Sequence, residues 1–352
     1  MKNKINILKA LKILMPVLFI FPGFINADDW QRLMKLKGQW KFSIGDNLEW
    51  AEVDYDDYDW EEVWVPSYWE NEGFNGYNGY AWYRKTFELD EELDFNNIYL
   101  FLGYIDDVDE VYLNGRNVGS SGGFPPDFAT AYNAERKYPI PVKYFNQKGK
   151  NVLAVRVFDA TMGGGINSGE IGLYVRKNSY LLEHDFEGKW QFNTGDKDEW
   201  KELSYDDGDW DSIFVPGYWE HQGYKDYNGV AWYRKTFTIN KRYDSQKLVL
   251  ILGKIDDIDE AYLNGVKIGF TGVIEDDPEE SSFEHEWQEF RGYLFDSKLL
   301  NVGKNVIAVR VYDNYINGGI YQGPIGITTQ SKYRKKWRKS KTDKSVWEYL
   351  FD

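Results

Sequence analysis

Short apolar runs, each bounded by glycine, asparagine, aspartate or proline, recur along the chain. Four of them read YAWYRKTFEL, NIYLFLG, VDEVYLNG and NVLAVRVFD. They are rich in β-branched and aromatic residues, which favour strands over helices. These runs do not alternate with long amphipathic helical segments, which disfavours a parallel α/β sheet. The pattern therefore predicts an all-β fold.

Two Asn-Gly pairs, Asn114-Gly115 and Asn264-Gly265, separate neighbouring apolar runs. This pair is typical of a two-residue hairpin turn, because both central positions of that turn need a positive φ. We expect a β-hairpin at each pair.

The whole pattern is repeated further along the chain. VPSYWENEGFNGYNGYAWYRKTF returns as VPGYWEHQGYKDYNGVAWYRKTF, and LGYIDDVDEVYLNG returns as LGKIDDIDEAYLNG. The unit is too long for a solenoid repeat or a propeller blade, whose repeats run to about 20–50 residues. The copies are therefore predicted to be two domains, residues 28–178 and 179–330, folded as two β-sandwiches in series. The linker between them is short, without a proline or serine run, so we expect the sandwiches to pack together.

The two ends of the chain differ from its body. Residues 1–27 begin with lysines, continue into an apolar stretch and end at Ala27, which is typical of a signal peptide. An uncleaved N-terminal anchor is the alternative. After Ala27 no run of about 20 apolar residues follows, so no membrane span is expected in the mature chain. Residues 331–352 carry eight Lys or Arg against three acids and form a predicted basic tail.

The net charge and the lack of cysteine restrict the kinds of partner and the stabilising bonds that the protein can have. The formal net charge is −15, and removal of residues 1–27 takes away four lysines and no acids, which moves it to −19. Such a surface repels phosphate backbones, so nucleic acid is not expected as a partner. The chain has no cysteine, which excludes disulfides. With a signal peptide, we expect a secreted or periplasmic bacterial protein.

The tryptophans fall into two groups. Trp69 and Trp219 follow a proline at the end of an apolar run and precede a Gly/Asn-rich loop, so we interpret them as the candidates for exposure. An exposed indole offers a flat apolar face to a sugar ring. Six others are spaced ten residues apart beside acidic turns, where packing under the turn is the favoured interpretation: Trp40, Trp50, Trp60, Trp190, Trp200 and Trp210.

The loops after Trp69 and Trp219 carry the triplets Tyr77-Asn78-Gly79 and Tyr227-Asn228-Gly229. An asparagine amide both donates and accepts, which suits sugar hydroxyls, although a plain Asn-Gly turn is the alternative. Asp159 and Asp313 end an apolar run and precede a Gly-rich segment, where backbone can approach a ligand or another backbone closely. The predicted carbohydrate-binding residues are Trp69, Tyr77, Asn78 and Asp159, with Trp219, Tyr227, Asn228 and Asp313 in the second copy.

The segments IDDVDE and IDDIDE place acids at positions 106, 107, 109 and 110, and again at 256, 257, 259 and 260. Their spacing does not match the twelve-residue calcium loop. Alternate residues of a strand point to opposite faces, so at most half of each group can share one site. Hydrogen bonding at turns and ladder edges is the favoured interpretation, with a structural calcium ion as the alternative. No other cofactor is expected, and no metal ligand is assigned.

No catalytic residue is assigned either. The segment around Ser121 satisfies the nucleophile-elbow expression G-x-S-x-G. That motif requires a strand before the serine and a helix after it, whereas here a proline-containing loop follows. The second copy lacks the serine.

Together these motifs resemble a known module. The motifs LKGQWKF, VP-x-x-W-E, YNG-x-AWYRKTF, D-x-x-YLNG and NV-(L/I)-AVRV with its Gly-rich loop are similar to the sugar-binding, galactose-binding-like jelly roll of glycoside hydrolase family 2, the β-galactosidase and β-glucuronidase type. This resemblance implies two tandem jelly-roll β-sandwiches of the galactose-binding-domain type. The motifs also resemble the jelly roll of sialate O-acetylesterases. In β-galactosidases an asparagine from the loop after the VP-x-x-W segment reaches toward the sugar. Asn78 and Asn228 resemble that asparagine by position. In both families catalysis belongs to a separate domain, and a hydrolase barrel alone needs about 250 residues.

The resemblance implies a secreted, non-catalytic carbohydrate-binding protein that is accessory to glycan degradation. Its expected partners are an oligosaccharide or polysaccharide and a glycan-degrading enzyme. One alternative is a component of a family 2-like or acetylesterase-like hydrolase whose catalytic domain lies in another chain; an enzyme of this kind would be a β-galactosidase-like glycoside hydrolase. A structural or adhesion module is the other. The copies differ most at residues 120–138 and 271–293, where we expect any functional difference.

Overall fold

The computed structural model describes residues 30–89, 93, 97–177, 181–244, 246–275, 281 and 285–337. The predicted signal peptide and the predicted tail beyond residue 337 lie outside the described residues. Among the described residues, no helix has the length and apolar character needed to cross a membrane.

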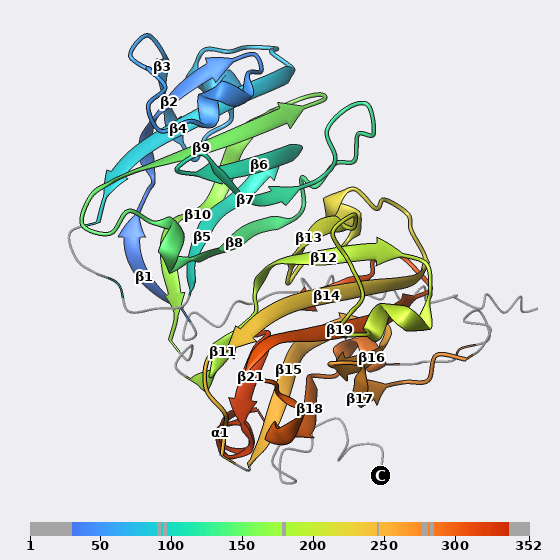
Figure 1. Ribbon diagram of the computed structural model, residues 1–352. Coiled ribbons are helices and arrows are strands. Elements are labelled where there is room, and N and C mark those ends of the chain that lie inside the picture. Colours follow the sequence, from blue (N-terminus) through green and yellow to red (C-terminus); the bar gives the residue numbers. More distant parts are fainter. Residues whose placement is uncertain are drawn as a thin grey trace, which may run out of the picture.

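Strands dominate both halves of the chain (Figure 1). In the first half they are β1 (Trp30–Lys35), β2 (Gly38–Ile44), β3 (Glu61–Val65), β4 (Gly79–Glu88), β5 (Asn97–Asp106), β6 (Val108–Leu113), β7 (Arg116–Ser121), β8 (Glu135–Pro141), β9 (Lys150–Asp159) and β10 (Gly165–Arg176). In the second half they are β11 (His184–Asp185), β12 (Gly188–Thr194), β13 (Asp211–Val215), β14 (Gly229–Ile239), β15 (Lys247–Asp256), β16 (Ile258–Leu263), β17 (Val266–Thr271), β18 (Arg291–Asp296), β19 (Gly303–Asp313), β20 (Gly319–Gln322) and β21 (Gly326–Thr329). The α-helix is α1 (Gln330–Lys336), and the short 3-10 helices are η2 (Leu48–Ala51), η3 (Trp69–Glu72), η4 (Val142–Tyr144), η6 (Asp198–Lys201), η7 (Glu220–Gln222), η9 (Glu286–Gln288) and η10 (Ser297–Leu299).

Each half folds into a sandwich of two antiparallel sheets. The six-stranded sheet has the order β3-β2-β4-β9-β6-β7 in the first half and β13-β12-β14-β19-β16-β17 in the second. The opposing sheet has the order β1-β10-β5-β8 in the first half, and β11-β21-β15-β18 with β20 also paired to β15 in the second. The duplication therefore extends to the strand order, and the predicted all-β fold of two tandem jelly-roll sandwiches is confirmed.

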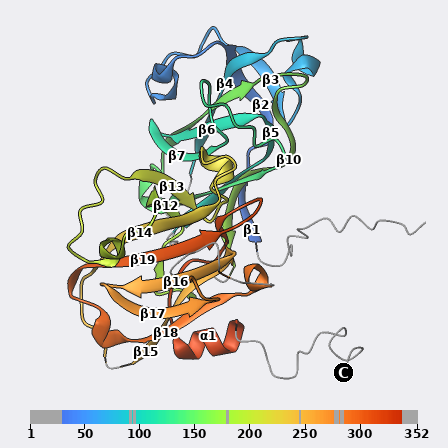
Figure 2. The same ribbon diagram turned by 90° about the vertical axis from the view of Figure 1, so that its right-hand side faces the viewer.

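The continuous apolar run of β5 is explained by burial on both of its faces. Leu100 and Leu102 point into the core between the two sheets. Tyr99 and Phe101 point outward, where Trp30 covers them. In the second sandwich the outer face of β15 is covered by residues at and beside α1, which lies against that sheet (Figure 2).

Local expectations about turns are also confirmed. The Asn-Gly pairs join β6 to β7 and β16 to β17, with a φ of 51° at both Asn114 and Asn264. Trp50 and Trp60 pack edge to face with ring centroids 5.0 Å apart, and Trp200 and Trp210 do the same at 5.0 Å. Trp40 and Trp190 lie in the two main cores.

The two sandwiches pack against each other, as the short linker predicted. Strand β8 lies against β12, and the backbone of Gly122 donates a hydrogen bond to the carbonyl of His221. Glu187 accepts from the hydroxyl of Tyr99 at 2.6 Å and pairs with Arg176 at 2.6 Å. These contacts connect the start of the second sandwich to the outer face of the first. Glu187 is almost fully buried at this junction.

Candidate functional site

Loops from three parts of each copy meet at one end of its sandwich. Gly79, which follows Asn78, pairs with Asp159 where β4 begins and β9 ends. Asp106, where β5 ends, pairs with Gly165, where β10 begins. The sheet registers therefore bring together the YNG turn, the acidic segment and the Gly-rich segment, which are far apart in the sequence. The second copy repeats both pairings, Gly229 with Asp313 and Asp256 with Gly319.

The prediction that Trp69 and Trp219 are exposed is wrong, because both side chains are 0% exposed. The indole nitrogen of Trp69 donates to the carbonyl of Tyr77 at 3.1 Å, which holds the YNG loop against the core. A Cβ on Gly164 would lie 2.1 Å from the Trp69 ring, and one on Gly318 would lie 2.0 Å from the Trp219 ring. The Gly-rich segments thus allow backbone to lie against a buried indole. These tryptophans have no free face for a sugar.

The YNG residues divide between structure and surface. The hydroxyl of Tyr77 donates to the carbonyl of Tyr80 at 2.6 Å, and Tyr227 does the same to Val230 at 2.6 Å. Each tyrosine ring is half-buried and packs on the core of its sandwich. The asparagine that follows each of them is exposed. Among the eight predicted site residues, these two asparagines are the ones that face solvent.

Three carboxylates meet beneath each YNG loop. The first aspartate triad is Asp106, Asp107 and Asp159, whose ligand oxygens lie within 4.8 Å of one another. The second aspartate triad is Asp256, Asp257 and Asp313, with the same closeness.

In both triads two consecutive aspartates converge, since the first ends one strand and the second lies at the bend before the next strand. The expectation that at most half of each acidic group shares a site is met. The two acids that converge are neighbours in the sequence, however, and not every second residue. The reason is that the chain bends between them, so the strand's alternation of faces does not apply there.

Asp159 and Asp313 are the most unusual members of the triads. Both are 0% exposed, and neither carboxylate accepts a hydrogen bond from the described residues. Asp107, by contrast, accepts from the hydroxyl of Thr130 and from the backbone amide of Ala160 at 3.1 Å. The predicted contact of Asp159 and Asp313 with a sugar is not supported, because both carboxylates are buried and a sugar ring at the surface does not reach them.

Burial and mutual repulsion shift the titration of these acids. Burial, followed by the hydrogen bond to Asp107 and its charge, raises the pKa of Asp106 to about 7. Burial and the charges of Asp107 and Asp106 raise the pKa of Asp159 to about 7; the amide of Thr161 acts in the opposite direction without completing a hydrogen bond. In the second copy burial is again the largest cause, and raises the pKa of Asp256 to about 8 and that of Asp313 to about 7. In these four aspartates burial and nearby negative charge favour the uncharged form of the carboxyl group.

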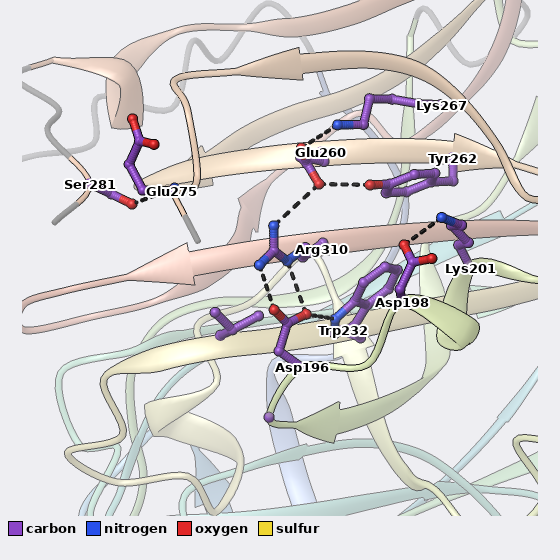
Figure 3. Close-up of polar contacts among 12 residues, drawn as sticks. Asp196, Asp198, Lys201, Trp232, Glu260, Tyr262, Lys267, Glu275, Ser281 and Arg310 are labelled. Atoms are coloured by element: carbon purple, nitrogen blue, oxygen red, sulfur yellow. Dashed lines mark hydrogen bonds and ion pairs between the residues drawn. The ribbon is translucent and has the colours of Figure 1, made fainter. Parts of the chain in front are cut away.

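The remaining acids of the two segments form ion pairs. Asp109 pairs with Arg136 at 2.7 Å, and Asp259 pairs with Arg291 at 2.8 Å, with all four side chains fully buried. Figure 3 shows that Arg310 bridges Glu260 and Asp196, and that the indole of Trp232 also donates to Asp196. This half of each acidic group therefore has a structural role, through ion pairs with arginine side chains and not through the predicted turn and ladder hydrogen bonds.

A cleft of about 780 Å³ lies between the two sandwiches. Aromatic side chains from both of them line it, namely Trp30, Tyr104, Tyr218, Tyr321 and Trp337. Polar side chains also line it, among them Asn133, Glu135, Lys137, Arg176, Asp185, Glu187, His221, Gln222 and Gln322. We call this site the interdomain cleft.

The aromatic residues of the interdomain cleft include a stacked pair. The rings of Tyr218 and Tyr321 lie 4.9 Å apart and 5° from parallel, and Tyr104 is 38% exposed. Ser121 also lines the cleft, where its hydroxyl is 2.9 Å from the hydroxyl of Tyr138. The variable segment 120–138 thus forms part of one wall, whereas part of its counterpart, 271–293, lies outside the described residues.

Sequence reasoning did not identify this cleft. Tyr218 directly precedes Trp219, and Tyr321 lies in the Gly-rich segment of the second copy. Nothing in the local pattern relates either residue to Tyr104, since they meet only through the docking of two domains.

Comparison with known proteins confirms the resemblance to glycoside hydrolase family 2. Residues 45–162 match the family model described as "Beta-galactosidase second all-beta domain". A protein of Formosa agariphila named "Putative beta-glucuronidase" is 28% identical over 152 residues, which cover 40% of this chain and 13% of that protein. The β-galactosidase BoGH2A of Bacteroides ovatus is 29% identical over 140 residues, which cover 34% of this chain and 15% of that protein. The chain thus matches only a small part of the length of these hydrolases.

Solved structures of the same kind also match. β-Glucuronidase 2 of Bacteroides uniformis has a TM-score of 0.37 and 16% identity, covering 82% of this chain and 28% of its own. β-Glucuronidase of Bifidobacterium dentium has a TM-score of 0.35 and 13% identity, covering 81% of this chain and 43% of its own.

Proposed function

We propose that this protein binds carbohydrate without cleaving it, and that the interdomain cleft is its binding site. The observation that carries the proposal is the set of aromatic rings from both sandwiches in one concave site, beside side chains that donate and accept hydrogen bonds. Sugar rings stack their C–H faces on aromatic side chains, while their hydroxyls need paired donors and acceptors. The volume of the cleft suits a ligand of a few sugar units.

The relatives support carbohydrate as the ligand class. Both curated relatives are glycoside hydrolases by name, and the matched family model is an all-β domain of β-galactosidase. We therefore propose a role accessory to glycan degradation, in a secreted or periplasmic bacterial setting. The catalytic partner would be a glycoside hydrolase domain outside residues 1–352.

Three acids of the first sandwich, Asp109, Glu110 and Asp159, are held in structural contacts or buried. Glycoside hydrolysis uses two carboxyl groups about 5–10 Å apart that flank the glycosidic bond in an accessible cleft. Asp109 is buried in its pair with Arg136, and Glu110 pairs with Arg156 at 3.1 Å. Asp159 has no accessible carboxylate oxygen. None of these acids is placed to protonate a leaving group.

A glycan array followed by calorimetric titration tests the proposal. We expect the purified protein to bind at least one of the plant, algal or host glycans on the array. Tyr218→Ala and Tyr321→Ala should each weaken that binding about tenfold, since each removes a ring of the stacked pair. The matched control is Tyr58→Ala, because Tyr58 is 83% exposed and does not line the cleft. Silence across the array with folded protein would remove carbohydrate binding as the function.

The YNG loops provide the competing location for the same function. If Asn78→Ala and Asn228→Ala abolish binding while the two tyrosine variants do not, the ligand lies at the sandwich ends instead of the cleft. Both asparagines are exposed, so these variants should fold normally.

A hydrolase component is the second candidate, favoured by the match to a domain of much longer hydrolases. We expect the purified chain alone to leave aryl β-galactosides and aryl β-glucuronides intact. Turnover that a single Asp→Asn change abolishes would contradict the non-catalytic proposal.

A further inference from the structure

We infer that each aspartate triad is a binding site for one divalent cation of the calcium type. The first site would use Asp106, Asp107 and Asp159, and the second would use Asp256, Asp257 and Asp313. This inference is independent of the proposed carbohydrate binding and concerns a different place in the molecule.

The chemistry and spacing of the donors favour calcium. All three donors are carboxylates, and hard cations prefer oxygen ligands. Calcium binds oxygen at about 2.3–2.6 Å, so oxygens on opposite sides of one ion lie roughly 5 Å apart. The triad oxygens lie within 4.8 Å of one another, which matches this span. Magnesium, at about 2.0–2.1 Å and with strict octahedral demands, needs a tighter set.

The buried carboxylates of Asp159 and Asp313 are the second, independent observation. Each is 0% exposed, and both oxygens of each accept no hydrogen bond from the described residues. A buried carboxylate without a partner is costly, so such groups are normally paired or bound to metal. Each belongs to the set of oxygens that could hold a single ion, so the unsatisfied acceptors point into the triad.

The nearest arginine does not neutralise the first triad. Arg136 directs its Nε to Asp109 at 2.7 Å and donates to the backbone carbonyls of Asp107 at 3.0 Å and of Ala131. It therefore positions the triad loop through backbone contacts, while its charge is shared with Asp109. Arg291 does the same in the second copy, with Asp259 at 2.8 Å and the carbonyl of Asp257 at 2.7 Å. The triads thus keep an excess of negative charge.

A fourth carboxyl group lies near the triad in both copies. Glu70 accepts from the amide of Gly164 at 3.2 Å, and Glu220 accepts from the amide of Gly318 at 2.9 Å. Each lies close enough to act electrostatically on its triad, and the charge of Glu70 raises the pKa of Asp159 after burial and the two other triad acids. Asp106 and Asp256 are only partly buried, which leaves an approach for a small ion from solvent.

The alternative occupant of each triad is a proton shared between carboxylates. Protons and metal compete for the same oxygens, so the two occupants are distinguished by adding metal at fixed pH. The repetition of the same three aspartates at the same strand ends, in two copies whose loops differ elsewhere, supports one common ligand.

The test is calcium binding by the purified full chain after treatment with EDTA. We expect equilibrium dialysis against up to about 5 mM CaCl₂ to give two bound ions per chain, since three carboxylates suit affinities in the range of extracellular calcium modules or tighter. At 100-fold excess over the dissociation constant, calcium should raise the melting temperature by roughly 5 °C or more. The same concentration of magnesium should give a smaller shift.

Single isosteric variants assign the sites. Asp159→Asn and Asp313→Asn should each reduce the bound calcium from two ions to one, and the double variant should bind none. Each change removes one of several repelling charges, so the calcium-free variants should melt no lower than the calcium-free parent. The matched controls are Asp59→Asn and Asp209→Asn, which alter exposed acids at corresponding positions of the two copies and should keep both ions.

Three results would overturn the assignment. The first is folded protein that binds no calcium and melts at the same temperature with calcium and with EDTA, which would leave protons as the occupants. The second is calcium binding that survives in the double variant, which would place the ions elsewhere. The third is the loss of one ion in only one of the two single variants, while the other variant keeps both ions. This would overturn the assignment for the copy whose variant keeps both ions. None of these readouts involves a glycan, so failure here is distinguishable from failure of the carbohydrate proposal.

Discussion

Two glycines decide how the Gly-rich segments pack. Gly164 and Gly318 each lie against the edge of a buried indole, at a distance where no side chain fits. The sequence showed that glycine was needed there, but left open whether the close neighbour was a ligand or another part of the chain. In the structure the close neighbour of Gly164 is the ring of Trp69, and that of Gly318 is the ring of Trp219.

Gly164→Ala should therefore destabilise the first sandwich by about 1–3 kcal/mol or more, because the added methyl forces the indole or the backbone to move. Chemical denaturation of the purified protein measures this change in the free energy of unfolding. Gly208→Ala is the matched control, since that glycine is exposed in a turn and a Cβ added there would lie 3.2 Å from the flexible carboxylate of Asp206. Equal stability of the two variants would contradict the packing argument.

Asp185 gives a pH dependence at the junction of the sandwiches. Burial, followed by the charge of Glu187, raises the pKa of Asp185 to about 7, although Arg176 acts in the opposite direction. One arginine near two carboxylates leaves one of them uncompensated. Between the ordinary aspartate pKa and about 7 the folded chain holds more protons than the unfolded chain, so stability falls as pH rises through this window.

Asp185→Asn should remove this loss of stability. We expect the variant to gain about 1–3 kcal/mol over the parent at pH 8, and the gain to shrink toward pH 5. The asparagine oxygen can still accept from the amide of Glu187, which Asp185 accepts at 3.0 Å. Urea unfolding at a series of pH values checks the slope, and parallel curves for parent and variant would refute the prediction.

At the scale of elements, the strands and hairpins follow from local pattern, but the long loops depend on single buried cations. Arg84 on β4 donates from Nε to Asp57 at 2.7 Å and from Nη1 to the carbonyl of Glu52 at 3.0 Å. Arg234 on β14 repeats these contacts with Asp207 at 2.8 Å and Glu202 at 3.1 Å. A loop that local pattern would leave irregular is thereby held against its sheet.

Arg84→Lys should loosen the loop around residues 48–58, because an ammonium group cannot reach several acceptors with the fork geometry of a guanidinium. We expect a loss of about 2–3 kcal/mol and faster amide exchange in that loop. Arg116→Lys, at an exposed arginine, should change neither quantity. Unchanged exchange in Arg84→Lys would mean that the loop is held by its tryptophans alone.

At the scale of the whole molecule, the junction of the two sandwiches creates the interdomain cleft. The guanidinium of Arg176 lies over the ring of Trp30, with 4.9 Å between its central carbon and the ring centroid, and pairs with the buried carboxylate of Glu187. Tyr99 donates to the same carboxylate. This small network fixes the relative position of two domains that the sequence presents only as neighbours.

Glu187→Ala should weaken the junction of the sandwiches, because the buried hydroxyl of Tyr99 loses its acceptor and Arg176 loses its direct ion pair, keeping only the nearby charge of Asp185. A cost of about 3–5 kcal/mol is typical for breaking a buried pair from one side. Small-angle scattering should show a larger radius of gyration, and any glycan bound in the cleft should be lost. Glu183→Ala removes the partly exposed pair with Lys332 and should leave the dimensions unchanged.

The sequence by itself determined the fold class, the duplication, the hairpins and the turn-packing tryptophans, because these depend on strand periodicity and local turn chemistry. Tertiary structure alone decided which acids meet, since the closeness of Asp106, Asp107 and Asp159 comes from pairing β5 with β10 and β4 with β9. It also decided that Trp69 is core, because Gly164, which lies against its ring, comes from 95 residues further along the chain. The cleft depends on domain docking, which joins side chains that no period in the sequence relates.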